Sequence, residues 1–109
     1  FKKISLEELI KNINDLKCGE FLFNFVEREG LMNGYNIRII KNLISYINKP
    51  LIFCGGAGKL AHLEEVLSLG NCSVACGSFF IYANKNKGVL INYLDNDDKD
   101  SLSLKILNK

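Results

Sequence analysis

The chain has 109 residues, of which 48% are hydrophobic and 24% are charged, and its formal net charge is +2. This length allows one domain at most, and the composition is that of a folded globular protein rather than a disordered one. The charge is too small to indicate nucleic-acid binding, and no apolar run approaches the roughly 20 residues that span a bilayer. We therefore expect neither a nucleic-acid partner nor a membrane partner.

The N-terminal part of the chain predicts a helix followed by a strand. Ser5 and Glu8 have the spacing of a capping box, and apolar residues follow with helical period as far as position 16. Residues 20–26 then form a nearly continuous apolar run that is interrupted by Asn24. Such a run is typical of a parallel strand that is covered on both faces.

Two further helices and two further strands are predicted, at residues 37–47, 51–53, 59–69 and 72–76. Asn36 can cap the first of these helices, and Gly70 can close the second. Helices and strands therefore alternate along the chain, which indicates βαβ units and a parallel sheet.

The end of the chain is less regular. Residues 79–82 predict a short helical turn, and residues 88–94 fit either a strand or a helix by periodicity. Residues 95–100 are acidic and are expected to be solvated, and residues 101–109 are expected to form a frayed or loosely packed end. We treat the whole chain as one domain that ends in a polar tail over residues 95–109.

Two glycine-rich turns follow the second and third predicted strands. Glycines in such turns free backbone N–H groups to approach an anion, and a helix that begins there adds the positive end of its dipole. The last two loops of many (β/α)8 barrels hold a phosphate in this way. The sequence therefore predicts a phosphate site formed by Gly55, Gly56, Gly77 and Ser78. The alternatives are that the glycines only make tight turns and that Ser78 is a plain helix cap.

The cysteines give no sign of a metal or of disulfides. The chain has four of them, at positions 18, 54, 72 and 76, and they lack the CxxC spacing and the nearby His of a zinc site. Most lie in apolar runs, where Cys behaves as a small hydrophobe. We expect structural free thiols, a reducing cytoplasm, no metal and no cofactor, and a metal or redox role for the cysteines is the alternative.

Three parallel strands cannot close a (β/α)8 barrel, which takes about 250 residues. The spacing of the predicted strands nevertheless matches that of the βα units of such a barrel. The fold class that we expect is α/β, as a fragment of a (β/α)8 TIM barrel. The chain also has no initiator Met, and we expect it to begin inside a longer protein or to need a partner.

A set of motifs along the chain carries a family resemblance. The motifs are Gly19-Glu20-Phe21-Leu22-Phe23-Asn24, Glu27-Arg28-Glu29-Gly30, Gly34-Tyr35, Cys54-Gly55-Gly56-Ala57-Gly58-Lys59 and Gly77-Ser78-Phe79-Phe80. Together they resemble the cyclase subunit of imidazole glycerol phosphate synthase over about residues 6–94, as the C-terminal part of its barrel. The resemblance implies a cyclase and lyase of histidine biosynthesis that takes ammonia from a glutaminase partner and acts on a phosphorylated substrate.

The resemblance also implies roles for single residues. The two glycine turns look like the grip for one substrate phosphate, and Glu20 looks like an acid of the ammonia gate at the barrel base, or else a solvated strand entry. Asn24 occupies an inward position, facing ligand, lumen water or another barrel side chain. Glu29 either contacts substrate or is an ordinary surface carboxylate. We expect Lys59 to be solvated or to help hold phosphate, and His62 to be partly exposed without a catalytic role.

The sequence departs from the family pattern in two ways. The family's general acid and base are Asp residues on strands one and five, and neither strand is in this chain, so we assign no catalytic residue. The loop at residues 27–30 reads Glu-Arg-Glu-Gly where the family usually has Asp-Arg-Asp-Gly. Asn24, Cys54, Phe79-Phe80 and Val89-Leu90-Ile91-Asn92-Tyr93 look more like a paralogous branch that delivers ammonia to a sugar amidotransferase in surface-polysaccharide biosynthesis. Another phosphate-binding barrel isomerase and a non-catalytic remnant are further alternatives.

Overall fold

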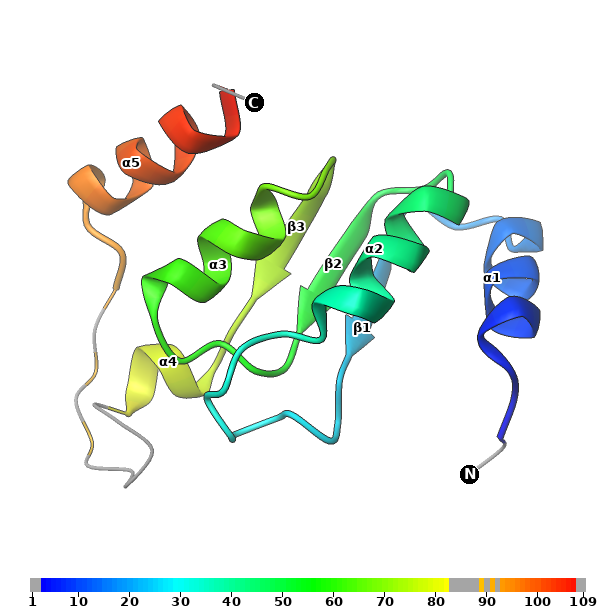
Figure 1. Ribbon diagram of the computed structural model, residues 1–109, viewed down its shortest axis with the longest axis horizontal. Helices are drawn as coiled ribbons and strands as arrows, with labels where there is room; N and C mark the ends of the chain where they lie inside the picture. Colours follow the sequence, from blue (N-terminus) through cyan, green and yellow to red (C-terminus); the bar gives the residue numbers. More distant parts are fainter. Residues whose placement is uncertain (1–2, 83–88, 90, 92, 108–109) are drawn as a thin grey trace.

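The centre of the fold is a three-stranded parallel sheet (Figure 1). The computed structural model describes residues 3–82, 89, 91 and 93–107. The strands are β1 (Phe21–Asn24), β2 (Leu51–Cys54) and β3 (Cys72–Ala75), and they lie in chain order. Their last residues, Asn24, Cys54 and Ala75, pair in register, so the carboxyl ends of all three strands meet at one edge. The predicted parallel α/β sheet is confirmed, and it has the arrangement of three successive strands of a (β/α)8 barrel.

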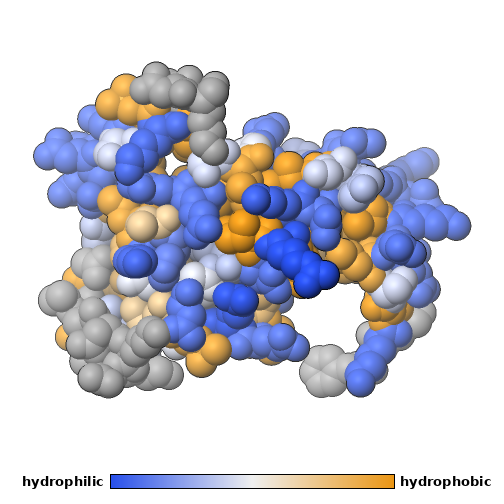
Figure 2. Space-filling view, viewed as in Figure 1, coloured by the Kyte–Doolittle hydropathy of each residue, from blue (hydrophilic) through white to orange (hydrophobic). Residues whose placement is uncertain are grey.

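Helices cover one face of this sheet. The helices are α1 (Leu6–Asp15), α2 (Ile37–Tyr46), α3 (Leu60–Leu67), α4 (Ser78–Ile81) and α5 (Asn96–Leu107). Figure 1 shows α2 and α3 lying in front of the strands. The most buried side chains lie between these layers, namely Ile40, Leu43, Phe53, Leu63 and Val66, each 2% exposed or less. Figure 2 shows the same face as mostly polar, with apolar atoms visible between α2 and its neighbouring helices.

The other face of the sheet is open in this chain, contrary to our expectation of a strand covered on both sides. Along β1, burial alternates: Phe21 and Phe23 are half-buried on the helix side, whereas Leu22 is 58% exposed. The alternation arises because the helices of this chain pack on one side only. In a closed barrel the opposite face is the one that points to the interior.

The helix starts follow the predicted capping. The Ser5 hydroxyl accepts a hydrogen bond from the Glu8 amide, and the Asn36 side chain accepts one from the Ile39 amide. Helix α3 is shorter than predicted, because it ends at Leu67 rather than continuing to Gly70. Gly70 does not have the positive φ of a glycine cap, and the chain instead turns at Ser68.

The C-terminal segment differs most from expectation. The predicted loose end is helix α5, which begins with a reciprocal cap: the Asp95 carboxylate accepts from the Asp98 amide at 2.8 Å, and the Asp98 carboxylate accepts from the Asp95 amide. Leu102 is buried in the core, and the Lys105 ammonium pairs with the Glu64 carboxylate of α3 at 2.6 Å. The acidic run is largely exposed, as expected, but it begins a helix that packs on α3, so the predicted frayed end is wrong.

Two remaining expectations concern residues 79–94 and membrane insertion. The predicted turn near residue 80 is the short helix α4. Residues 88, 90 and 92 of the segment at 88–94 lie outside the described residues, and Val89 forms an isolated antiparallel bridge with Tyr82. Within the part of the chain that the structure describes, every helix is too short or too polar to cross a bilayer.

Candidate functional site

The two glycine turns meet at the carboxyl edge of the sheet. Because β2 and β3 are neighbours in register, the turns that follow them emerge side by side. One small hollow is lined by Glu29, Gly30, Gly55, Gly56, Ala57, Cys76, Gly77 and Ser78. The structure thus brings together all four residues of the predicted phosphate grip and adds Glu29 to them. Their binding of phosphate stays a prediction.

The size of the hollow limits what can enter it. Its cavity volume is about 10 Å³, which is room for about one water molecule. A phosphate group would therefore sit at the mouth with a single oxygen directed inward. Most of the lining residues are glycine or alanine, which leave the backbone accessible, as suits recognition by N–H groups.

The first turn requires glycine for the fold itself. Gly55 has φ +100° and Gly56 has φ +126°, conformations that side chains rarely tolerate. A Cβ at Gly55 would lie 2.7 Å from the carbonyl oxygen of Phe25. At Gly56 it would lie 2.7 Å from the carbonyl carbon of Gly34 and closer still to its oxygen. These glycines therefore let the turn pack against the 25–36 loop, whether or not an anion binds.

The second turn does not require glycine for the fold. Gly77 has φ −113°, and a Cβ there would meet no atom within 4 Å. The absence of a side chain leaves its backbone open at the hollow, which is the feature that close approach of a ligand needs. Gly77, rather than Ser78, occupies the N-cap position of α4, so the alternative that Ser78 is a plain helix cap is wrong.

The 25–36 loop lies against the first turn and carries Glu29. The Arg28 guanidinium donates to the Gly34 carbonyl at 3.3 Å, and the Gly34 amide donates to the Gly56 carbonyl at 2.7 Å. The Cys54 thiol points to the Glu29 carboxylate at 3.9 Å. A carboxylate repels a phosphate but accepts hydrogen bonds from hydroxyl groups. Glu29 at this hollow is thus suited to the hydroxyl-bearing part of a ligand.

The other two candidate residues lie apart from the hollow's lining. Asn24 ends β1 and is exposed on the open face, and its side-chain oxygen is 3.1 Å from where a Cβ of Gly55 would be. Glu20 directly precedes β1 and is exposed at the amino edge of the sheet, opposite the glycine turns. The structure therefore separates Glu20 from the other candidates, which is the separation expected between a barrel base and a substrate site.

His62 is a residue whose role the sequence reasoning missed. Its Nδ1 accepts a hydrogen bond from the Gly58 amide at 3.0 Å, and its ring lies 3.5 Å from where a Cβ of Gly34 would be. His62 is three residues after Lys59, which precedes α3 without making a side-chain cap. The three-residue spacing between Lys59 and His62 could have indicated this contact. In a capping box, the side chain at the third helical position bonds back to the backbone at the helix start.

The described cysteines are all free thiols. Burial, and then the neighbouring Cys54, raise the pKa of Cys76 from 9.0 to about 11. Burial and then Glu29 raise the pKa of Cys54. As the pH rises, the Cys76 thiol ionises in the unfolded chain at a lower pH than in the folded protein. The stabilisation that comes from this difference is therefore complete below pH 9 and is lost as the pH rises toward about 11.

Cys76 is accordingly expected to resist alkylation. At pH 8 the raised pKa lowers the thiolate fraction of Cys76 about 100-fold. A thiolate of higher pKa is more nucleophilic, which offsets part of this loss of rate. We therefore expect iodoacetamide to label Cys76 roughly 10 to 100 times more slowly in the folded protein than in urea. Mass spectrometry of timed samples measures this rate, with the exposed Cys18 as the internal control. Equal labelling of both cysteines in the folded protein would contradict the assignment.

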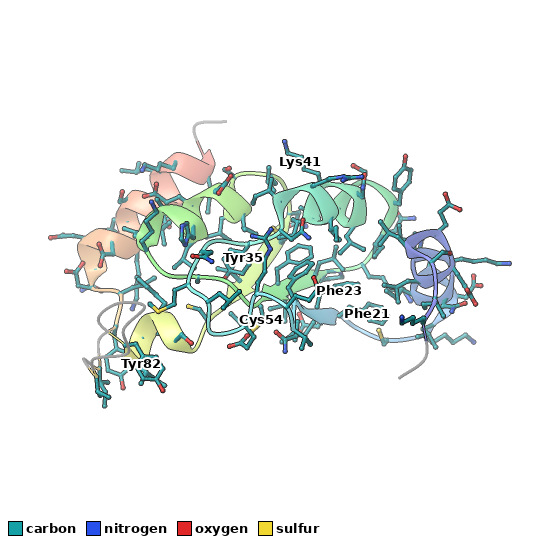
Figure 3. The ribbon with its side chains drawn as sticks, turned by 60° about the horizontal axis from the view of Figure 1, so that its bottom comes forward. Phe21, Phe23, Tyr35, Lys41, Cys54 and Tyr82 are labelled. Carbon is teal, nitrogen blue, oxygen red and sulfur yellow. The ribbon has the colours of Figure 1, made fainter. Side chains whose placement is uncertain are left out.

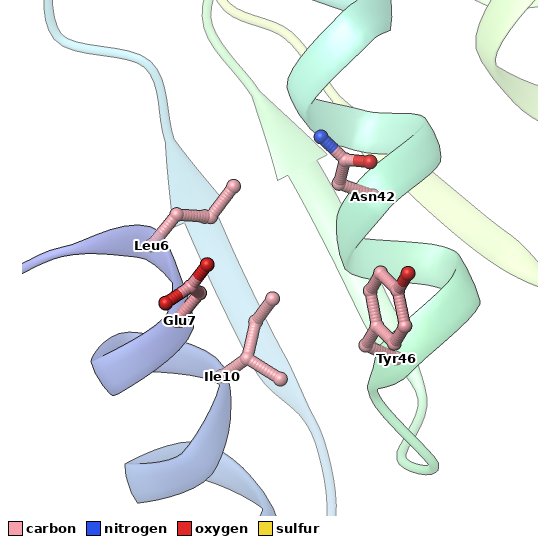
Figure 4. A pocket seen from close by; sticks show the side chains of 5 residues that line it. All are labelled: Leu6, Glu7, Ile10, Asn42 and Tyr46. Atoms are coloured by element: carbon pink, nitrogen blue, oxygen red, sulfur yellow. The ribbon is translucent and has the colours of Figure 1, made fainter.

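A larger hollow lies elsewhere, between α1 and α2 (Figure 4). Its volume is about 360 Å³, and it is lined by Leu6, Glu7, Ile10, Asn42 and Tyr46. Glu7 is its one acidic lining residue, and neither glycine turn contributes to the lining. Its chemistry does not suit an anion. Among the described residues, no three His, Cys, Asp or Glu side chains are grouped so that they could hold a metal ion.

Parallel βα units with glycine turns at the carboxyl edge are the arrangement of part of a (β/α)8 barrel, a class in which many members bind phosphate with such turns. Comparison with known protein families gives a more specific assignment. Residues 2–87 match the family described as "Histidine biosynthesis protein", and the chain belongs to that family. The resemblance stated from the sequence motifs is thereby confirmed.

Individual relatives carry more specific names. A Leptospira borgpetersenii protein named "Putative imidazole glycerol phosphate synthase subunit HisF" is 43% identical over 98 residues, which cover 89% of this chain and 39% of that protein. A Sulfurisphaera tokodaii protein, "Imidazole glycerol phosphate synthase subunit HisF", is 36% identical over 63% of this chain and 28% of its own length. A Pseudomonas aeruginosa protein named as subunit hisF2 is 34% identical over 81% of this chain and 36% of its own length. The chain thus spans about two fifths of the first relative's length.

Proposed function

We propose that this chain supplies the C-terminal phosphate site of a cyclase subunit of the imidazole glycerol phosphate synthase type. The complete subunit would use ammonia from a glutaminase partner to close the imidazole ring and cleave a C–N bond in histidine biosynthesis. The observation that carries the proposal is the shared hollow at which both glycine turns meet. The names of the relatives support the same activity.

Each part of the site has a role in this proposal. Backbone amides of Gly56, Gly77 and Ser78 would bind one phosphate of the substrate. Glu29 would accept hydrogen bonds from sugar hydroxyls beside it. Glu20, at the opposite edge of the sheet, would belong to the gate through which ammonia enters. General acid and base catalysis would come from outside these 109 residues.

Substitution of Gly77 by alanine tests the phosphate site. The fold tolerates a methyl group there, because φ is ordinary and no atom lies within 4 Å. We expect the affinity of the natural protein for inorganic phosphate to fall about tenfold or more, since a hydrogen bond to a charged group contributes roughly 1.5 kcal/mol or more. Isothermal titration calorimetry measures the affinity, and the thermal midpoint is expected to stay unchanged.

Gly19→Ala is the matched control, because a Cβ at Gly19 also meets nothing within 4 Å and the residue lies outside the hollow. This variant is expected to bind phosphate as the natural protein does. Absence of phosphate binding by the natural protein would overturn the proposal. Unchanged phosphate binding by Gly77→Ala would show that the second turn is not part of the phosphate site.

A further inference from the structure

Tyr35 links the 25–36 loop to the end of β3. Its ring is 4% exposed at the carboxyl edge of the sheet (Figure 3), and its hydroxyl donates to the carbonyl oxygen of Ala75 at 3.0 Å. This bond joins residues 40 positions apart in the chain. Ala75 is the last residue of β3 and stands directly before the second glycine turn. The position of that turn therefore depends on a side chain from a different loop.

The adjacent residue makes the equivalent link to the first turn. The Gly34 amide donates to the carbonyl oxygen of Gly56 at 2.7 Å. The two backbones touch so closely here that a Cβ at Gly56 would collide with Gly34. Two consecutive residues of one loop thus hold two turns that follow different strands.

The loop that carries this pair is itself fixed at several points. The Phe25 amide donates to the carbonyl oxygen of Cys54 at 2.9 Å, next to the first turn. Arg28 donates to the Gly34 carbonyl, and the His62 ring lies 3.5 Å from where a Cβ of Gly34 would be. A loop held in this way can act as a fixed spacer between the turns.

We propose that Gly34 and Tyr35 form a clamp that sets the distance between the two phosphate-binding turns, with Tyr35 as a positioning residue. The inference rests on the proposed phosphate site and adds to it a residue that does not line the hollow. An anion held by amides of two turns binds strongly only if both turns are at the correct separation, because misplaced donors lose most of their hydrogen-bond energy.

Tyr35→Phe tests the clamp, because it removes the hydroxyl while the buried ring remains. In the natural protein, we expect the dissociation constant for inorganic phosphate to rise about fivefold, which corresponds to the net value of one neutral hydrogen bond. The number of sites in the titration is expected to stay the same. In amide NMR spectra, the phosphate-induced shift of Ser78 is expected to decrease more than that of Gly56, since only the second turn has lost its link.

Tyr46→Phe is the matched control, because Tyr46 is 62% exposed on α2, away from both turns. It removes a phenol hydroxyl and is expected to leave phosphate binding unchanged. A merely structural role for Tyr35 would reduce the number of sites at an unchanged dissociation constant, and this result would overturn the clamp. Binding by Tyr35→Phe that equals the natural protein would also overturn it.

A measurement on the unaltered protein covers the case in which Tyr35→Phe fails to fold. If phosphate binds only the clamped loop, then phosphate at ten times its dissociation constant is expected to slow exchange of the Gly34 amide about 11-fold. The Leu16 amide, which bonds to Ile13 at the end of α1, is the internal control and is expected to change little. Equal slowing of both amides would contradict the clamp, whereas no phosphate binding at all would contradict the proposed function instead.

Discussion

Replacing Gly56 by alanine is expected to destabilise the fold by about 3 kcal/mol or more and to abolish phosphate binding. The positive φ of +126° alone costs an L-residue roughly 1–2 kcal/mol. The added methyl group would also overlap the backbone of Gly34, and forced backbone movement in a packed region typically costs about 1–3 kcal/mol. The only relief is separation of the turn from the 25–36 loop, which would break the bond between the Gly34 amide and the Gly56 carbonyl.

Urea unfolding followed by circular dichroism measures this loss. Gly77→Ala and Gly19→Ala are the controls, since both place a methyl group in open space at an ordinary φ. Comparing the stabilities of these variants distinguishes two roles of glycine. At position 56 we expect the fold to require glycine, whereas at position 77 we expect only ligand binding to require it. A Gly56→Ala variant as stable as Gly77→Ala would show that the first turn can move away from the loop at little cost.

The regular elements could be predicted from the sequence because local patterns determine them. The stripe from Ile37 to Ile47 and the short apolar run after Pro50 fix a helix and a strand without any tertiary information. The order of the strands then follows from right-handed βα connections, which place successive parallel strands beside each other. The same argument predicted that the two glycine turns would lie side by side.

The interactions that hold the turns together could not be predicted in this way. The bond from Tyr35 to Ala75 joins two loops by a geometry that no periodicity encodes. Tyr35 was noted in the sequence only as part of a family motif. The contact between Gly56 and Gly34 is similarly invisible, because a glycine pattern predicts a turn but does not identify the backbone that packs against it.

Helix α5 was missed for a different reason, since a local signal was present. Asp95 and Asp98 have the spacing of a reciprocal cap, but an exposed acidic run does not by itself indicate that a helix begins there. The helix itself is barely amphipathic, and Leu102 is its one described side chain that is classed as buried. Tertiary contact with α3, rather than a hydrophobic stripe, supports it.

Replacing Phe53 by alanine is the second substitution for which we expect a large effect. The Phe53 ring is 0% exposed at the centre of β2, with ring centroids 6.0 Å from Phe23 and 6.3 Å from Phe25. Truncation of a buried Phe removes its transfer energy and leaves a cavity, which typically costs about 3–5 kcal/mol. The cavity would lie in the core behind β2, whose chain continues directly into the first turn at Gly55.

Two further variants show whether packing is the cause. Phe53→Leu retains much of the volume and is expected to lose under about 1.5 kcal/mol. Tyr46→Ala removes an aromatic ring that is 62% exposed on α2 and is expected to have a much smaller effect than Phe53→Ala in urea unfolding. If Phe53→Ala and Tyr46→Ala lost similar stability, the aromatic cluster would not be the support of the glycine turns. Unfolding of Phe53→Ala would show that the core is needed to support the site. A Gly77→Ala variant that stays folded but loses phosphate affinity would show that the open backbone at Gly77 is needed for binding.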